Sequence, residues 1–143
     1  MSDSPTGASA QRSYLRSPAA WLAGIASVAI LLLGVRAFLD PVSASAGFGL
    51  PMHTDSEITF VRVYGARNAF LGAVALSFLV LRMIRPLALL FTLATLLPLL
   101  DALVIVSRLG LSHELVRHAA ILVVLIVASI SLWRLDRARP RLQ

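Results

Sequence analysis

Asp101 and His118 are the two side chains whose types best suit proton transfer. A carboxyl and an imidazole can act as general acid and base, and histidine changes charge between about pH 5 and 8. Arg36 and Arg67 could hold an anionic group beside them. The candidate ligand-binding residues are all polar side chains inside apolar surroundings: Arg36, Tyr64, Arg67, Asn68, Asp101 and His118, with Asp101 and His118 as the catalytic candidates.

The string HELVRH at residues 113–118 carries His113, Glu114 and His118 as possible metal ligands. Its spacing differs from HExxH, in which two histidines lie one helical turn apart on the same face. Zinc motifs need tighter patterns, and the chain has no cysteine, which excludes disulfides, thiolate catalysis and cysteine-based metal sites. No phosphate-binding glycine loop or nucleophile elbow occurs. We predict neither a metal ion nor a cofactor.

The composition indicates that these side chains are carried by membrane-spanning elements. Of the 143 residues, 58% are hydrophobic and 14% are charged, and the mean hydropathy is +0.84. Soluble domains are about 45–50% apolar and about 25% charged. These values exclude an ordinary soluble globule and a disordered chain. The net charge of +6 comes from arginines that flank apolar runs, so we expect no nucleic-acid partner.

Four apolar runs predict an all-α protein, a four-transmembrane-helix antiparallel bundle, with helices at 19–39, 58–81, 87–109 and 115–133. A spanning helix needs about 20 apolar residues, and short connections make neighbours antiparallel. Residues 1–18 and 134–143 are expected to be a flexible and a basic cytoplasmic tail. Pro98 is expected to kink the third helix. Gly47, Gly49 and Pro51 are expected to prevent a regular helix in the connection at 40–57.

The first apolar run has two interpretations. Ala44 to Ala46 resembles a signal-peptidase site after the break at Asp40 and Pro41, which would make the run a cleaved signal peptide. However, the run has 21 residues and contains Arg36, whereas a signal h-region has about 7–15 apolar residues. We therefore expect a retained first span.

The arginines predict the orientation. Eight of them fall on one side of a four-span chain: Arg12, Arg16, Arg82, Arg85, Arg134, Arg137, Arg139 and Arg141. The other five fall on the opposite half, among acidic residues. Because cytoplasmic loops carry the arginine excess, we predict a multi-pass protein of the cell membrane with both termini in the cytoplasm.

Each predicted span places one ionisable side chain at nearly the same depth. Arg36, Arg67, Asp101 and His118 lie 14 or 15 residues from the cytoplasmic end of their spans, which is about 21–23 Å at about 1.5 Å per residue. Such groups are costly in lipid and should face inward. We expect Arg67 to pair with Asp101, Glu114 to pair with His118, and His118 to be reachable by water. The layer is either a structural clasp or a ligand site.

Small residues follow one side of the second run: Gly65, Ala69, Gly72 and Ala73. Small residues spaced by three and four let two helix backbones approach closely in lipid. We expect this stripe to contact another span.

The segments AGFGLP (46–51), VRVYGARNAFLG (61–72), LLPLLDALV (96–104) and RHAA (117–120) carry a family resemblance. The chain resembles a family of small four-span bacterial and fungal membrane proteins that is described as a domain of unknown function and is distantly similar to DoxX-like proteins. The resemblance covers about residues 19–133 and supplies no established activity. Its matching positions are Arg36, Pro41, Gly47, Phe48, Gly49, Pro51, Arg62, Gly65, Arg67, Gly72, Asp101 and His118. The family often has Asp where this chain has Asn68, which removes one acid from the layer.

Three hypotheses for the function remain open. The first is a membrane protein that binds a lipid, a small hydrophobic ligand or a partner through the polar layer. The second is a membrane enzyme acting on a lipid-soluble substrate, with Asp101 and His118 as acid and base. The third is a subunit of an oligomeric exporter, although four-span exporters usually carry an acid in the first span, where this chain has Arg36. The expected partners are the bilayer, a small hydrophobic ligand and a second copy of the chain.

Overall fold

The computed structural model describes residues 17–111 and 113–138, so most of both predicted tails lies outside the described residues. The protein is all-α, with helices α2 (Pro18–Leu39), α3 (Pro41–Phe48), α4 (Asp55–Val80), α5 (Ile84–Ala94), α6 (Leu96–Leu109) and α7 (His113–Arg137). Four stretches of the described chain are long and apolar enough to cross a membrane: Pro18–Leu39, Asp55–Val80, Ile84–Arg108 and Leu115–Arg137. The predicted fold class is confirmed.

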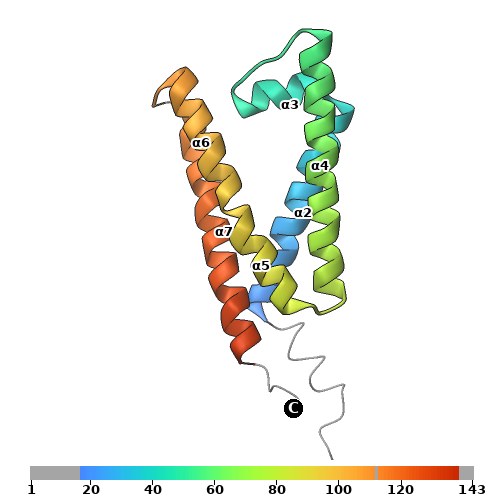
Figure 1. Cartoon of the computed structure of the whole chain (residues 1–143), viewed down its shortest axis with the longest axis vertical. Coiled ribbons are helices and arrows are strands. Elements are labelled where there is room, and N and C mark those ends of the chain that lie inside the picture. Colours follow the sequence, from blue (N-terminus) through green and yellow to red (C-terminus); the bar gives the residue numbers. More distant parts are fainter. Residues whose placement is uncertain (1–16, 112, 139–143) are drawn as a thin grey trace, which may run out of the picture.

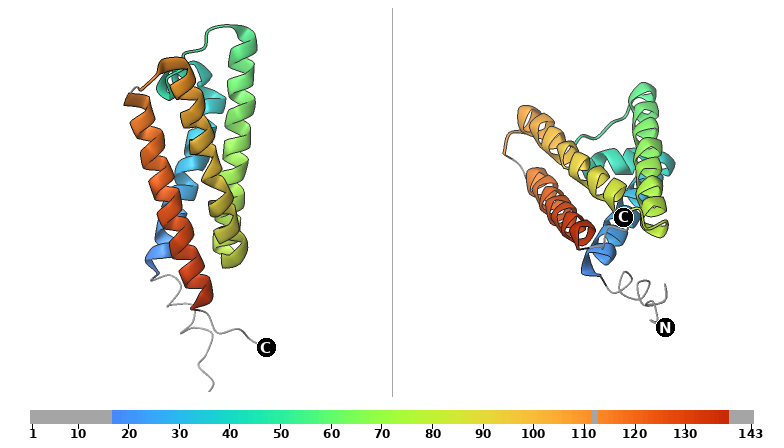
Figure 2. Two further views of the ribbon diagram at one scale, coloured as in Figure 1. Left: turned by 60° about the vertical axis from the view of Figure 1, so that its left-hand side comes forward. Right: turned by 60° about the horizontal axis from the view of Figure 1, so that its bottom comes forward.

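The helices form two arms that meet at one end and separate at the other (Figure 1). One arm is α2 packed along α4, the most extensive helix contact, and the other is α5 and α6 packed along α7. The arms touch mainly through α2 with α7 and α4 with α5. We call the end where α2 starts and α7 finishes the terminal end, and the end that carries α3 the mouth end. Figure 2 shows the same helices from two other directions, and its right-hand view again shows α6 apart from α4.

The buried core joins the arms at the terminal end. Its fully or nearly buried side chains come from α2, α4, α5 and α7: Ala20, Ala23, Ala75, Ile84, Leu87, Ala88, Phe91, Ala128 and Leu132. Thr92 also contacts Ser129 at 2.7 Å between their hydroxyl oxygens, and it accepts a 3.0 Å hydrogen bond from the Trp133 indole. The apolar core therefore joins the two arms far from the mouth end, and these hydrogen bonds hold α5 to α7 within one arm.

Glycines bring α2 and α4 into backbone contact. A Cβ on Gly65 would lie 2.6 Å from the Phe38 nitrogen, and one on Gly72 would lie 2.6 Å from the Leu31 nitrogen. A Cβ on Gly34 would meet the backbone of α4. The predicted small-residue stripe therefore contacts another span, α2, at Gly65 and Gly72. Its last member, Ala73, is exposed.

The connection at 40–57 contains the helix α3, so the expectation that glycines prevent a helix there was wrong. Asp40 caps the helix by accepting a 3.2 Å hydrogen bond from the Ser43 backbone, and Pro41 occupies the first turn, where its missing N–H costs nothing. Gly49 ends the helix at φ 97°, a left-handed conformation that favours glycine. The glycine therefore terminates a helix that the preceding residues form.

The third span is divided at Thr95, between α5 and α6. Pro98 lies four residues after Ala94, so it cannot donate to the Ala94 carbonyl and its ring crowds that carbonyl. At the break, the Thr95 N–H donates to Thr92 O at 3.3 Å. This is an i to i−3 hydrogen bond, which is tighter than the i to i−4 bond of a regular α-helix. The predicted kink is present one turn before the proline.

Helix α4 begins at Asp55, earlier than the predicted start at residue 58. Thr54 and Glu57 form a capping box that satisfies the first backbone N–H groups. The polar residues before the apolar run are therefore part of the helix.

Candidate functional site at the mouth of the bundle

His118 and Asp101 meet between the antiparallel helices α7 and α6. His118 Nδ1 lies 3.7 Å from Asp101 Oδ2, and the His118 side chain is 5% exposed. This distance exceeds a hydrogen bond, and Nδ1 has no hydrogen-bond partner among the described residues. His118 is thus buried, contrary to the expectation that water reaches it. The pair supplies an acid and a base from two helices.

Helix α3, which packs against α2 and α4, contacts His118 from the other arm. The Phe48 ring packs edge-on against the His118 ring, with centroids 4.9 Å apart and an interplanar angle of 78°. Arg117 donates a hydrogen bond to the carbonyl of Gly47. Neither Phe48 nor Gly47 was among the predicted site residues. The available signal was the helix between Pro41 and Gly49, whose last turn carries both residues.

Helix α4 contributes Tyr64 and Asn68 from one face. Their side chains are four residues apart on the helix, and Tyr64 lies close enough to Asn68 and to Asp101 to interact electrostatically with each. The mouth site is defined here as Phe48, Tyr64, Asn68, Asp101 and His118. It combines residues from four helices, α3, α4, α6 and α7.

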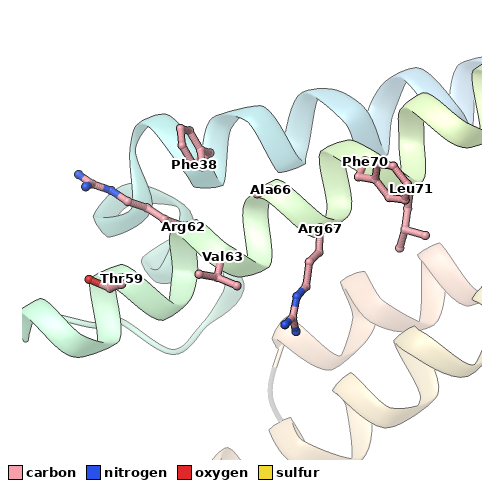
Figure 3. Close-up of a pocket in the computed structure, with 8 residues that line it drawn as sticks. All are labelled: Phe38, Thr59, Arg62, Val63, Ala66, Arg67, Phe70 and Leu71. Atoms are coloured by element: carbon pink, nitrogen blue, oxygen red, sulfur yellow. The ribbon is translucent and has the colours of Figure 1, made fainter.

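The structure places the two arginines of the predicted layer elsewhere. Within 4.0 Å, the described partner of Asp101 is His118, so the expected Arg67–Asp101 ion pair is not formed. Arg67 is exposed and lines a shallow apolar groove of about 650 Å³ on α4 (Figure 3). Arg36 donates a 3.0 Å hydrogen bond to the Ser43 hydroxyl at the start of α3. The side chain of Glu114 is outside those that the structure describes, so the expected Glu114–His118 pair stays a prediction.

The described residues contain no group of three or more histidine, cysteine, aspartate or glutamate side chains placed to hold a metal ion. The mouth site instead offers a carboxylate acceptor, an imidazole, a phenol and an amide beside one aromatic ring. This set can bind a polar group attached to an apolar molecule. It can also move a proton between Asp101 and a bound group.

A family model described as Domain of unknown function (DUF4267) matches residues 27–132. The chain belongs to the DUF4267 family. The match includes most of α2 and all five residues of the mouth site, so these features lie within the DUF4267 domain. Comparison with curated proteins and with solved structures finds no match.

Proposed function

We propose that this membrane protein binds a small hydrophobic ligand through a hydroxyl or similar polar group at the mouth site. The single observation that carries the proposal is His118, which is 5% exposed and whose Nδ1 has no hydrogen-bond partner among the described residues. A buried polar atom left without a partner costs about 1–3 kcal/mol. Buried polar groups are nearly always satisfied, so such an atom needs an explanation.

The chemistry of the pair favours a hydroxyl. A hydroxyl can donate to the Asp101 carboxylate and accept from a protonated His118 Nδ1, and the 3.7 Å between those atoms is too long for them to satisfy each other. Phe48 supplies an apolar contact beside the imidazole. The site lies where the arms separate, so a ligand from the bilayer would not have to open the core.

Native mass spectrometry of the purified protein tests this proposal. The wild type is expected to retain a small molecule that His118→Gln loses, because glutamine keeps a polar side chain of similar length but has no imidazole. His53→Gln is the matched control, since His53 is an exposed histidine in the connection between α3 and α4. If the wild type carries no ligand, or if both variants retain it equally, the proposal is wrong. The mouth site would then serve only to hold the helices together.

Catalysis on a lipid-soluble substrate is the second candidate function. The observation that favours it is the placement of Asp101 beside the imidazole, an arrangement in which a carboxylate can orient a general base. Asp101→Asn should then stop conversion of the retained molecule while leaving its binding within a few fold. Unchanged conversion by Asp101→Asn would exclude this role.

We also propose that the terminal end faces the cytoplasm of a cell. The turn at residues 81–83 and the end of α7 lie at this end (Figure 1), which brings together Arg82, Arg85, Arg134 and Arg137. An arginine excess is retained on the cytoplasmic side during insertion. The mouth site would then open toward the outer leaflet.

A further inference from the structure

The groove on α4 has almost wholly apolar walls, with a few polar side chains along its rim. Thr59 and Arg62 line it nearest the start of the helix, and Val63, Ala66 and Phe70 continue it deeper (Figure 3). Phe38 of α2 and Leu71 complete the apolar walls. From Thr59 to Phe70 the groove runs about 16 Å at about 1.5 Å per residue, close to half of a hydrocarbon core about 30 Å thick. One leaflet of a bilayer matches this length.

Two cationic side chains flank the groove. Arg62 and Arg67 are exposed, and neither has a carboxylate within 4.0 Å among the described side chains. Glu57, five residues before Arg62, accepts hydrogen bonds from the His53 and Thr54 backbones at the start of the helix. An arginine is costly at hydrocarbon depth unless a counter-charge accompanies it. The groove therefore has uncompensated positive charge.

We propose that this groove binds an anionic phospholipid, with its phosphate on Arg62 and an acyl chain lying over Val63, Ala66 and Phe70. Thr59 and Arg62 lie at the end of the groove nearest the start of α4, so the headgroup is directed toward the mouth end. Guanidinium groups bind phosphate through paired N–H donors, and Arg62 lies at the end of the groove nearest the start of α4. Figure 3 shows Arg62 and Arg67 pointing in different directions, so Arg62 holds the phosphate and Arg67 adds attraction from the other rim.

Ala66 keeps the groove open. It is exposed and lacks a side chain beyond Cβ, so a phenylalanine there fills the groove without entering the α2–α4 contact. Ala73 is also exposed on α4, seven residues further along, and does not line the groove. Ala66→Phe and Ala73→Phe thus form a matched pair that leaves the charge unchanged.

Native mass spectrometry with added phosphatidylglycerol, phosphatidylcholine or inorganic phosphate tests the proposal. The wild type should retain phosphatidylglycerol in preference to the other two. Arg62→Gln should lower this retention about fivefold, as expected from the usual contribution of one arginine near anionic lipid. Arg62→Gln with Arg67→Gln should lower it further. Arg108→Gln removes the same charge from the mouth end outside the groove and should change it little.

The apolar half is tested by the alanine pair. Ala66→Phe should lower phosphatidylglycerol retention, and Ala73→Phe should not. Equal retention of phosphatidylglycerol and phosphatidylcholine, no loss in Arg62→Gln, or equal effects of the two phenylalanines would overturn the proposal. A dimer that Ala66→Phe dissociates would also overturn it, because the groove would then hold a second copy. Lipid binding at the groove can be distinguished from ligand binding at the mouth site. His118→Gln leaves the groove intact and should still retain phosphatidylglycerol.

Discussion

At the scale of single residues, the Asp101–His118 contact links α6 to α7 while the Phe48–His118 contact links α7 to α3. His118 is the residue shared by both contacts, and it is buried. Its replacement therefore changes packing as well as proton chemistry. For this reason the tests of function use His118→Gln, which keeps most of the volume, rather than alanine.

A double-mutant cycle should place the energetic partner of Asp101. Asp101→Asn and His118→Gln are each expected to lower the free energy of unfolding in detergent, and the double variant should lose less than their sum. Residues in direct contact usually couple by about 0.5–3 kcal/mol. Thermal or denaturant unfolding of the four proteins measures this coupling.

Arg67 provides the control for that cycle. The structure places Arg67 on the groove and gives Asp101 a different partner within 4.0 Å. The losses from Asp101→Asn and Arg67→Gln should therefore add within about 0.5 kcal/mol. A coupling of Asp101 to Arg67 larger than its coupling to His118 would contradict the described pairing.

At the scale of the helices, the contact of α2 with α4 depends on residues without side chains. Gly65→Val should lower the free energy of unfolding by at least about 1–3 kcal/mol, the usual cost of overpacking, because the new atoms meet backbone that cannot move aside. Gly34→Val should act in the same way. Unfolding of the purified variants in detergent measures the effect.

Gly47→Ala is the matched control for the glycine contact. It is a helical glycine in α3, and a Cβ there would meet no atom within 4 Å. The alanine should leave stability unchanged or raise it slightly, because alanine has the higher helix propensity. A stable Gly65→Val would mean that α2 and α4 are further apart than described.

The break between α5 and α6 sets the direction of α6 at the mouth end. Pro98→Ala restores the hydrogen bond to the Ala94 carbonyl and should straighten the third span. Spin labels at Val63 on α4 and Val104 on α6 should then report a changed distance. The chain has no cysteine, so introduced cysteines label only these two sites.

Pro51→Ala is the control for the change at Pro98. Pro51 lies between α3 and α4, outside any helix, and its replacement should leave the α4–α6 distance distribution unchanged. An unchanged distribution in Pro98→Ala would show that packing against α7 alone holds the break at Thr95.

The small helix α3 illustrates the limit of composition at this scale. Glycine and proline near each other predicted an irregular loop at 40–57. The outcome depended on their order: Asp40 and Pro41 start a helix well, and Gly49 ends one well. Reading the positions relative to a helix start would have placed Phe48 at its C-terminal turn.

At the scale of the whole molecule, a retained α2 is expected, because α2 forms the largest helix contact and contributes to the core. The protein purified from the membrane should therefore begin at a residue before Pro18, as N-terminal sequencing would show. A mature protein beginning near Gly47 would instead mean that the first span is cleaved and that the glycines of α4 face lipid.

Topology reporters test the proposed orientation. A fluorescent protein active in the cytoplasm should report after residue 143 and in the turn at 82–85, and a phosphatase active outside should report in the connection before Asp55. The physical reason is the arginine excess gathered at the terminal end. Phosphatase activity at the 82–85 turn would reverse the orientation.

The sequence by itself determined the features that depend on local chemistry. Apolar length set the number of spans, the Asp40–Pro41 step ended α2 through proline's backbone restriction, Pro98 broke the third span, and the small residues of α4 allowed a close neighbour. Each of these follows from properties of a few adjacent residues. The family match over residues 27–132 agrees with the resemblance found in the same segments.

Only the tertiary structure decided which polar groups meet. Counting residues places Arg36, Arg67, Asp101 and His118 at one depth, but it does not give the rotation of each helix about its axis or the distance between the arms. Because α2 and α4 use their glycine faces against each other, Arg67 is left on the exposed side of α4. Because α6 packs along α7, Asp101 meets His118, and Phe48 of α3 reaches His118 from the other arm.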